Sequence, residues 1–212
     1  MKIKWLGHAC FLFTSEDGTK VLTDPFDDHV GYKLPEVEAD IVTTSHDHYD
    51  HNAVDVVKGN FTHIKQPGTF EEKGIKITGI STFHDDAQGS KRGSNIIYVY
   101  EIDGIRICHC GDLGHLLSRE QIDKIGEIDV LLLPIGGVYT INAAQACEVM
   151  ESLNPVLTIP MHFQTPVLKF PLGTVDEFIA AAGGGERVDQ QEIEITKDGL
   201  SNYSDIIILN YE

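Results

Sequence analysis

Residues 46–51 of this chain, HDHYDH, place three histidines and two aspartates within six positions, directly after the apolar run DIVTTS. Imidazole nitrogens and carboxylate oxygens are the donors that zinc and similar divalent ions bind, and proteins usually present them from loops at the ends of rigid strands. In an extended loop His46 and His48 turn toward the same side, and Asp50 and His51 can present a second group of donors where the chain turns. The segment therefore predicts a metal site.

Two simpler interpretations of this segment stay open. Asp is a common helix N-cap, so Asp50 could cap a helix that we predict to start near His51 and to run through residues 53–58. A single histidine on such a loop is more often a surface residue than a ligand, and a motif match is a hypothesis until its context is known. The prediction therefore depends on donors elsewhere in the chain.

Further donors do follow later apolar runs. His84 lies in STFHDD, Asp112 in CHCGDLGH and His162 in TIPMHFQT, each at the end of a strand-like segment. Chance would scatter the ten histidines without regard to strand ends, and one loop cannot saturate two metal ions. We therefore expect these three residues to converge with the cluster at 46–51.

The pattern of apolar runs predicts two β-sheets packed face to face with helices outside, within one domain that spans residues 1–212. DG turns at 17–18 and 103–104 indicate hairpins. The predicted strands are 3–6, 10–14, 20–25, 40–45, 75–80, 95–110, 129–134, 156–160, 192–195 and 205–209, and the predicted helices, besides the one near His51, are 118–125, 142–153 and 175–182.

The composition limits which kinds of molecule the protein is expected to bind and where it is expected to occur. The chain has 33 acidic and 16 basic residues, a formal net charge of -17, so a nucleic-acid partner is not expected. No apolar window approaches the ~18 residues that a membrane span needs. The four cysteines lack the spacing of a disulfide framework, which favours reduced thiols and a cytoplasmic location. A homo-oligomer is compatible with the sequence.

The chain resembles the metallo-β-lactamase superfamily, whose binuclear hydrolases carry an H-x-H-x-D-H motif followed by a distant His, a bridging Asp and a last His. The resemblance is strongest to its small metal-dependent hydrolase branch, which includes ascorbate-6-phosphate lactonase-like proteins. It extends over WLGHACF, TDPF, HDD…G…RG.N, HCGDLGH and IPMHFQT, from about residue 3 to residue 170. The resemblance implies an α/β (α+β) fold of the αββα type, in which two mixed sheets are flanked by helices.

The resemblance also implies a ligand set for two divalent metal ions, with zinc first and manganese or iron as alternatives. His46, His48 and His84 would hold the first ion. Asp50, His51 and His162 would hold the second, and Asp112 would bridge both. Two such ions lower the pKa of a shared water so that hydroxide is available near neutral pH, which predicts a hydrolase acting on a small ester, lactone or phosphoester.

Other polar residues near strand ends are candidates for supporting roles. Asp24 could fix the ring of a histidine ligand, or it could simply belong to an Asp-Pro turn. Asp50 could also orient the attacking water or accept its proton. His8 and His115 could donate a proton to a leaving group or hydrogen-bond structurally, and we predict them, with Asp50, as catalytic candidates.

Arg92 is conspicuous in so acidic a chain, and it could recognise a phosphate or carboxylate on the small-molecule substrate. A solvated loop charge is the alternative for Arg92, and Tyr139 is a weaker candidate for lining the pocket. Two other functions stay open for the chain as a whole. One is a mononuclear iron dioxygenase-type enzyme on the same fold, and the other is a non-catalytic metal-stabilised binding protein.

Overall fold

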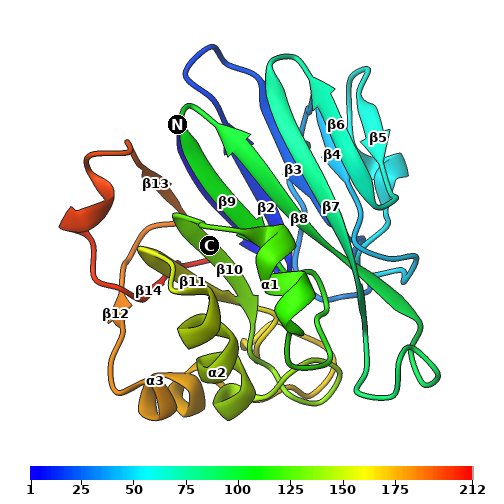
Figure 1. Cartoon of the computed structure of the whole chain (residues 1–212). Helices are drawn as coiled ribbons and strands as arrows, with labels where there is room; N and C mark the ends of the chain where they lie inside the picture. Colours follow the sequence, from blue (N-terminus) through cyan, green and yellow to red (C-terminus); the bar gives the residue numbers. More distant parts are fainter. Residues whose placement is uncertain (212) are drawn as a thin grey trace.

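The computed structural model describes residues 1–211 and contains two six-stranded sheets that face each other (Figure 1). The first sheet has the order β13-β1-β2-β3-β4-β5. Its strands are β1 (Lys2–Gly7), β2 (Cys10–Thr14), β3 (Lys20–Thr23), β4 (Ile41–Thr43), β5 (Thr62–Ile64) and β13 (Glu192–Glu194). The second has the order β11-β10-β9-β8-β7-β6. Its strands are β6 (Gly68–Glu72), β7 (Ile75–Phe83), β8 (Ser94–Ile102), β9 (Ile105–His109), β10 (Val130–Pro134) and β11 (Leu157–Met161).

The core lies between the two sheets. Alternate residues of β1 and β2 point inward, so that Trp5, Phe11 and Phe13 are fully buried, and Tyr98 and Tyr100 of β8 meet them from the other sheet. The rings of Phe13 and Tyr100 lie 5.2 Å apart at a steep angle. Each large apolar side chain removed from water in this way contributes roughly 1.5–3 kcal/mol, so the sandwich is a rigid support for the loops at its edges.

The predicted helices after the first half of the chain are confirmed. Their bounds are α1 (Arg119–Ile125), α2 (Ala143–Leu153) and α3 (Val175–Ala182), and Figure 1 shows α1 and α2 beside the second sheet and α3 beside α2. Each starts at a capping box, in which the side chain of Ser118, Asn142 or Thr174 accepts from a backbone N–H three residues on. Local sequence alone therefore determines where these helices begin.

The predicted helix near His51 is wrong. Residues 53–58 contain only a short 3-10 turn, η1 (Val54–Val56), and no side chain caps it. The backbone N–H of Ala53 donates instead to the carbonyl of Pro25, which ties this segment to the preceding loop. Asp50 is not an N-cap, because its carboxylate faces His8. The outer face of the first sheet is covered by this turn and by buried loop residues such as Phe26 and Tyr32.

Two edge strands have no counterpart in the sequence prediction. β5 and β6 close the first and second sheets at their edges, and most of their side chains are partly or fully exposed. Apolar alternation, the signal used for strands, is therefore weak in both. A further small pair joins β12 (Glu186–Arg187) to β14 (Ile207–Ile208), and η2 (Leu200–Asn202) lies between them in the chain.

Strand pairing brings the polar loops to one edge of the sandwich. β3 and β4 are parallel, as are β9, β10 and β11, and each antiparallel hairpin returns the chain so that β1 and β7 run in these same directions. The residues that directly follow these strands must therefore meet at the same edge. These residues include His8, Asp24, His46, His84, Asp112 and His162.

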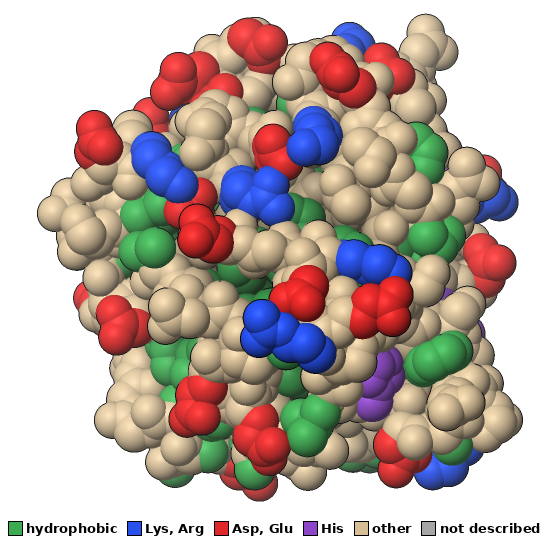
Figure 2. Space-filling model, viewed as in Figure 1, with side chains coloured by type: hydrophobic (Ala, Val, Ile, Leu, Met, Phe, Trp, Pro, Cys, Tyr) green, Lys and Arg blue, Asp and Glu red, His purple; other side chains and the backbone are tan. Residues whose placement is uncertain are grey.

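The exposed surface carries charge of both signs. On the face drawn in Figure 2, basic side chains lie among acidic ones and do not form a continuous basic surface. Among residues 1–211, no helix has the length and apolar composition that crossing a membrane requires.

Candidate metal centre

Seven histidines and aspartates predicted as ligands lie together at this edge, joined by His8. Within the part of the chain that the structure describes, their donor atoms form three overlapping sets whose members all lie within 4.8 Å of one another. The sets are His46 with His48 and His84, His46 with His51 and Asp112, and His8 with Asp50, His51 and His162. The first and third sets match the two groups that the family resemblance implies, with His8 added to the second group.

Asp112 lies between the two groups. One carboxylate oxygen, Oδ2, is 3.1 Å from Nε2 of His84 and 3.2 Å from Nε2 of His162. The other, Oδ1, is 3.3 Å from Nε2 of His51. Asn95 holds the segment in place, since its side-chain carbonyl accepts from the backbone N–H of Asp112 at 2.9 Å. The carboxylate of Asp112 therefore faces histidines of both donor groups.

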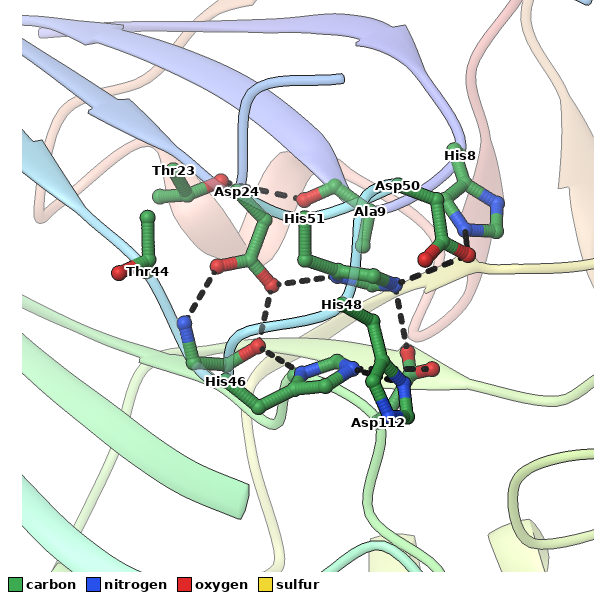
Figure 3. A network of polar contacts seen from close by, with 12 residues as sticks. His8, Ala9, Thr23, Asp24, Thr44, His46, His48, Asp50, His51 and Asp112 are labelled. Carbon is green, nitrogen blue, oxygen red and sulfur yellow. Dashed lines mark hydrogen bonds and ion pairs between the residues drawn. The ribbon is translucent and has the colours of Figure 1, made fainter. Parts of the chain in front are cut away.

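Asp24 is linked by hydrogen bonds to one histidine of each donor group, directly to His51 and through Ser45 to His46 (Figure 3). Its Oδ2 accepts from Nδ1 of His51 at 2.9 Å and from the Ser45 hydroxyl at 2.6 Å, and its Oδ1 accepts from the Ser45 backbone N–H at 2.7 Å. The same hydroxyl lies 2.9 Å from Nδ1 of His46. One buried carboxylate thus orients His51 directly and His46 through Ser45, which leaves Nε2 of each ring facing the cage.

His8 and Asp50 form a second contact pair. Nε2 of His8 lies 3.2 Å from Oδ2 of Asp50, and the His8 side chain is fully buried. The backbone carbonyl of His8 accepts from the indole N–H of Trp5 and from the backbone N–H of His162. His8 and His162 are therefore held as one unit, with ring centroids 4.2 Å apart.

The pKa shifts of Asp112 and His51 indicate that this part of the site favours a bound cation. Burial would raise the pKa of Asp112, but facing His162 and His51 lower it well below its ordinary range. Burial would lower the pKa of His51, yet Asp112, Asp24 and Asp50 raise it far above its usual value. The carboxylates thus create a negative potential that stabilises positive charge at this point.

The imidazole rings of His46 and His8 are held in the neutral form, which is the form that binds metal. Burial lowers the pKa of His46 to about 3 and that of His8 to about 4, so both imidazoles are neutral at pH 7. A divalent ion binds the neutral imidazole. Nε2 of His51 and Oδ1 of Asp112 are buried without a hydrogen-bond partner among the described residues. Buried polar atoms are normally satisfied, so these orphaned donor atoms fit a metal ion.

A pocket of about 530 Å³ opens onto the cage. Its floor includes His48, Asp50, His84, Asp112 and His162. Its walls are formed by Asp47, Tyr49, Lys91, Arg92, Tyr139 and Phe170. The pocket therefore combines donor atoms with aromatic walls, and its volume suits a small molecule.

The structure shows which of the other residues predicted to be functional line the pocket and which do not. Arg92 and Tyr139 both line the pocket, as expected for residues that contact a substrate. His115 is not among the residues that line it. Nε2 of His115 accepts from the backbone N–H of Phe83, so Nδ1 donates to the carbonyl of Leu116. We assign His115 to holding this loop rather than to proton transfer, because both ring nitrogens already have backbone partners.

Several supporting residues were not predicted. Ser45 and Asn95 position His46 and Asp112, and Phe170 forms part of the pocket wall. Ser45 directly precedes the histidine cluster, which was a usable signal. Asn95 stands in the segment HDD…G…RG.N that resembles the family, but its contact with Asp112 depends on sheet pairing. Phe170 is brought to the site by the loop after β11, and no local sequence pattern indicated it.

Comparison with known proteins agrees with this geometry. Residues 2–162 match the family described as "Beta-lactamase superfamily domain". A protein of Archaeoglobus fulgidus named a metal-dependent hydrolase is 34% identical, and the match covers 81% of this chain and 85% of that protein. A second metal-dependent hydrolase, from Thermococcus onnurineus, is 31% identical, and the match covers 94% of this chain and 97% of that protein.

Solved structures give the same result. A crystal structure from Thermotoga maritima, assigned as a Zn-dependent hydrolase of the metallo-β-lactamase superfamily, is 44% identical, has a TM-score of 0.82, and covers 98% of this chain and 97% of its own. An isothiocyanate hydrolase from Delia radicum gut bacteria is 15% identical with a TM-score of 0.69, covers 100% of this chain and 97% of its own, and shares the fold. The chain therefore belongs to the metallo-β-lactamase superfamily and is a metal-dependent hydrolase of its small-hydrolase branch.

Proposed function

We propose that this hydrolase uses two divalent metal ions, with zinc favoured over manganese or iron, to cleave a small ester, lactone or phosphoester. The observation that carries the proposal is the position of Asp112, whose two carboxylate oxygens face histidines of both donor groups. A carboxylate shared between two sets of three donors suits a pair of ions held close together.

The residues fall into two groups around this carboxylate. His46, His48 and His84 would hold one ion, and Asp50, His51 and His162 would hold the other. When bound, ions of this kind supply a nucleophile from water near neutral pH and polarise the bond to be cleaved.

The protein itself contributes the orientation of the metal ligands and of the attacking water. Asp24 keeps His51 and His46 in one tautomer and one direction. Burial would raise the pKa of Asp50, but the hydrogen bond with His8 and the nearby His51 lower it, so Asp50 is ionised and is suited to bind a metal ion and to accept a hydrogen bond that orients the attacking water. His8 supports this role by holding one oxygen of Asp50.

The pocket supports a small substrate. Its volume of about 530 Å³ and its aromatic walls at Tyr139 and Phe170 favour a molecule with an apolar part beside the reacting group. The rings of these two residues pack edge to face with centroids 5.9 Å apart, so this wall is fixed in position.

The test combines metal content with turnover. We expect about two equivalents of zinc or manganese per chain after purification without added metal, and metal-dependent hydrolysis of chromogenic esters, lactones or phosphoesters. Asp112→Asn keeps the size of the side chain and should abolish turnover while the far-ultraviolet circular dichroism stays unchanged. One equivalent of iron per chain without any hydrolysis would contradict the proposal and favour a mononuclear iron enzyme.

A further inference from the structure

Arg92 differs from every other arginine in the chain. The sequence has four arginines against 33 acidic residues, and three of them form ion pairs with a carboxylate, namely Arg106 with Glu101, Arg119 with Asp123 and Arg187 with Asp176. Arg92 has no carboxylate partner within residues 1–211, although it is half-buried on the wall of the pocket. In so acidic a protein, a cation kept free of carboxylates at this place is available to an anionic ligand.

The neighbouring cation does not share this property. Lys91 also lines the pocket, but its ammonium group lies 2.6 Å from the carboxylate of Asp86. Both side chains of this pair are mostly exposed, at 57% and 71%. The charge of Lys91 is therefore already balanced, and Arg92 is left as the cation that faces the substrate.

Arg92 is held in a defined direction. One Nη2–H donates to the carbonyl of Val138 at 3.3 Å, and the guanidinium carbon lies 5.2 Å from the centre of the Tyr139 ring. An arginine stacked on an aromatic face keeps its planar edge free for a bidentate contact with an oxyanion. Tyr139 and Phe170 thus form the apolar part of the wall, and Arg92 forms its cationic part, which would face an anionic group of a ligand.

Asp85 fixes the loop that carries Arg92. Its side chain is only 3% exposed, and its two oxygens accept four backbone N–H groups. Oδ1 accepts from Ala87 and Gly89, and Oδ2 accepts from Lys91 and Arg92, at 2.7–2.9 Å. The four N–H groups satisfy both oxygens of the ionised carboxylate within the loop, so Asp85 orders the backbone of Arg92 without pairing with its guanidinium.

We propose that Arg92 binds a carboxylate or phosphate group on the substrate, and that Asp85 is the positioning residue that holds Arg92 against the pocket wall. The proposal rests on the proposed hydrolytic function and names the class of substrate, a small anionic ester, lactone or phosphoester. The anionic group would lie at Arg92 while the bond to be cleaved lies over the donor cage, since both border one pocket.

The first experiment compares two esters that differ by one carboxylate, p-nitrophenyl acetate and mono-p-nitrophenyl succinate, with the metal-loaded protein. Arg92→Ala should raise KM for the succinate ester about 10-fold or more and leave the acetate ester nearly unchanged. Arg92→Lys should restore part of the loss, because the charge remains without the bidentate edge. Lys91→Ala removes an equal charge from the adjacent position and should change little. Equal effects of the two alanine variants, or of Arg92→Ala on both esters, would overturn the assignment.

The second experiment tests Asp85 against its neighbour. Asp85→Asn replaces one accepting oxygen with an NH₂ group that faces two backbone donors, so it should raise KM for the succinate ester while kcat for the acetate ester and the metal content stay close to the parent values. Asp86→Asn removes the same charge at an exposed position and should not raise KM. A matched loss for both esters in Asp85→Asn would show a merely structural role and refute the positioning of Arg92.

A binding measurement separates this inference from the proposed hydrolysis. Calorimetric titration of the metal-loaded protein with inorganic phosphate should give a weaker Kd for Arg92→Ala than for Lys91→Ala, whether or not any ester is cleaved. If neither these esters nor the chromogenic lactones and phosphoesters turn over but this difference is present, the reaction assigned above is wrong and the anion site stands. If phosphate binds both variants equally well, the anion site is wrong.

Discussion

Replacement of Asp24 by Asn is the sharpest test of how the cage is built. The change keeps the shape of a fully buried side chain and removes its charge. Asp24 accepts three hydrogen bonds, two from Ser45 and one from His51. In the Asn variant one oxygen can still accept from the Ser45 backbone, but the new NH₂ group faces the other two donors.

The expected loss can be estimated from these contacts. Hydrogen bonds to a charged group contribute about 1.5–3 kcal/mol each, and some relaxation of the site will recover part of the loss. We therefore expect Asp24→Asn to lower the free energy of unfolding by about 3 kcal/mol. Since His51 and His46 lose their common orienting group, affinity for metal should fall about 10- to 100-fold.

Two assays measure these effects. Urea unfolding of the metal-free protein reports the stability change, and competition with a chromophoric chelator reports metal affinity. Asp40→Asn is a suitable control, because Asp40 is a partly exposed carboxylate at the opposite end of the β3–β4 pair, where it accepts from Lys20 and Lys73. An Asp24→Asn protein that binds two ions with the parent affinity would refute the orienting role of Asp24.

Two further predictions concern pH and close packing. The pKa of His46 is lowered to about 3 and that of His8 to about 4, so below pH ~6.5 the unfolded chain binds protons that the folded chain does not. Stability of the metal-free protein should therefore fall as pH drops from about 6.5 to 4, by up to about 1.4 kcal/mol per pH unit for each histidine; urea unfolding that is flat across this range would contradict the assignment. A Cβ added at Gly114 would lie 2.3 Å from the backbone carbon of His84, so Gly114→Ala should reduce bound metal, measured by elemental analysis, whereas Gly184→Ala, with open space around it, should not.

Local sequence predicted the elements that carry their own signals. The helices α1, α2 and α3 begin at capping boxes, and the buried strands are apolar throughout, so both could be identified without tertiary information. The prediction of a helix near His51 was wrong because the Asp50 side chain, which the sequence suggests as an N-cap, instead contacts His8 after β1. A tertiary contact outweighed the local preference, and nothing within residues 46–58 could have indicated it.

The residues of the candidate site differ in the same way: some carry a local sequence signal and others depend on tertiary contacts. The donors were predictable because each stands at the end of an apolar run, and strand direction brings such ends together. The supporting residues depend on contacts far apart in sequence. Asn95 reaches Asp112 over 17 positions, and Asp24 reaches His51 over 27. Asp24 could be suspected as a partner of a histidine, but which histidine it orients is decided by the pairing of β3 with β4.

The backbone at the cage could not be predicted at all, and it bears on what holds the cage together. His8, Asp24 and His162 adopt the left-handed region, with φ of 52°, 39° and 52°. Such conformations cost of order 1 kcal/mol or more and persist where surrounding contacts determine them. The His8 carbonyl accepts two hydrogen bonds, and the carboxylate of Asp24 accepts three. The strands and these hydrogen bonds therefore impose the directions of the donors before any ion binds, and the stability of the sandwich offsets the strain of the site.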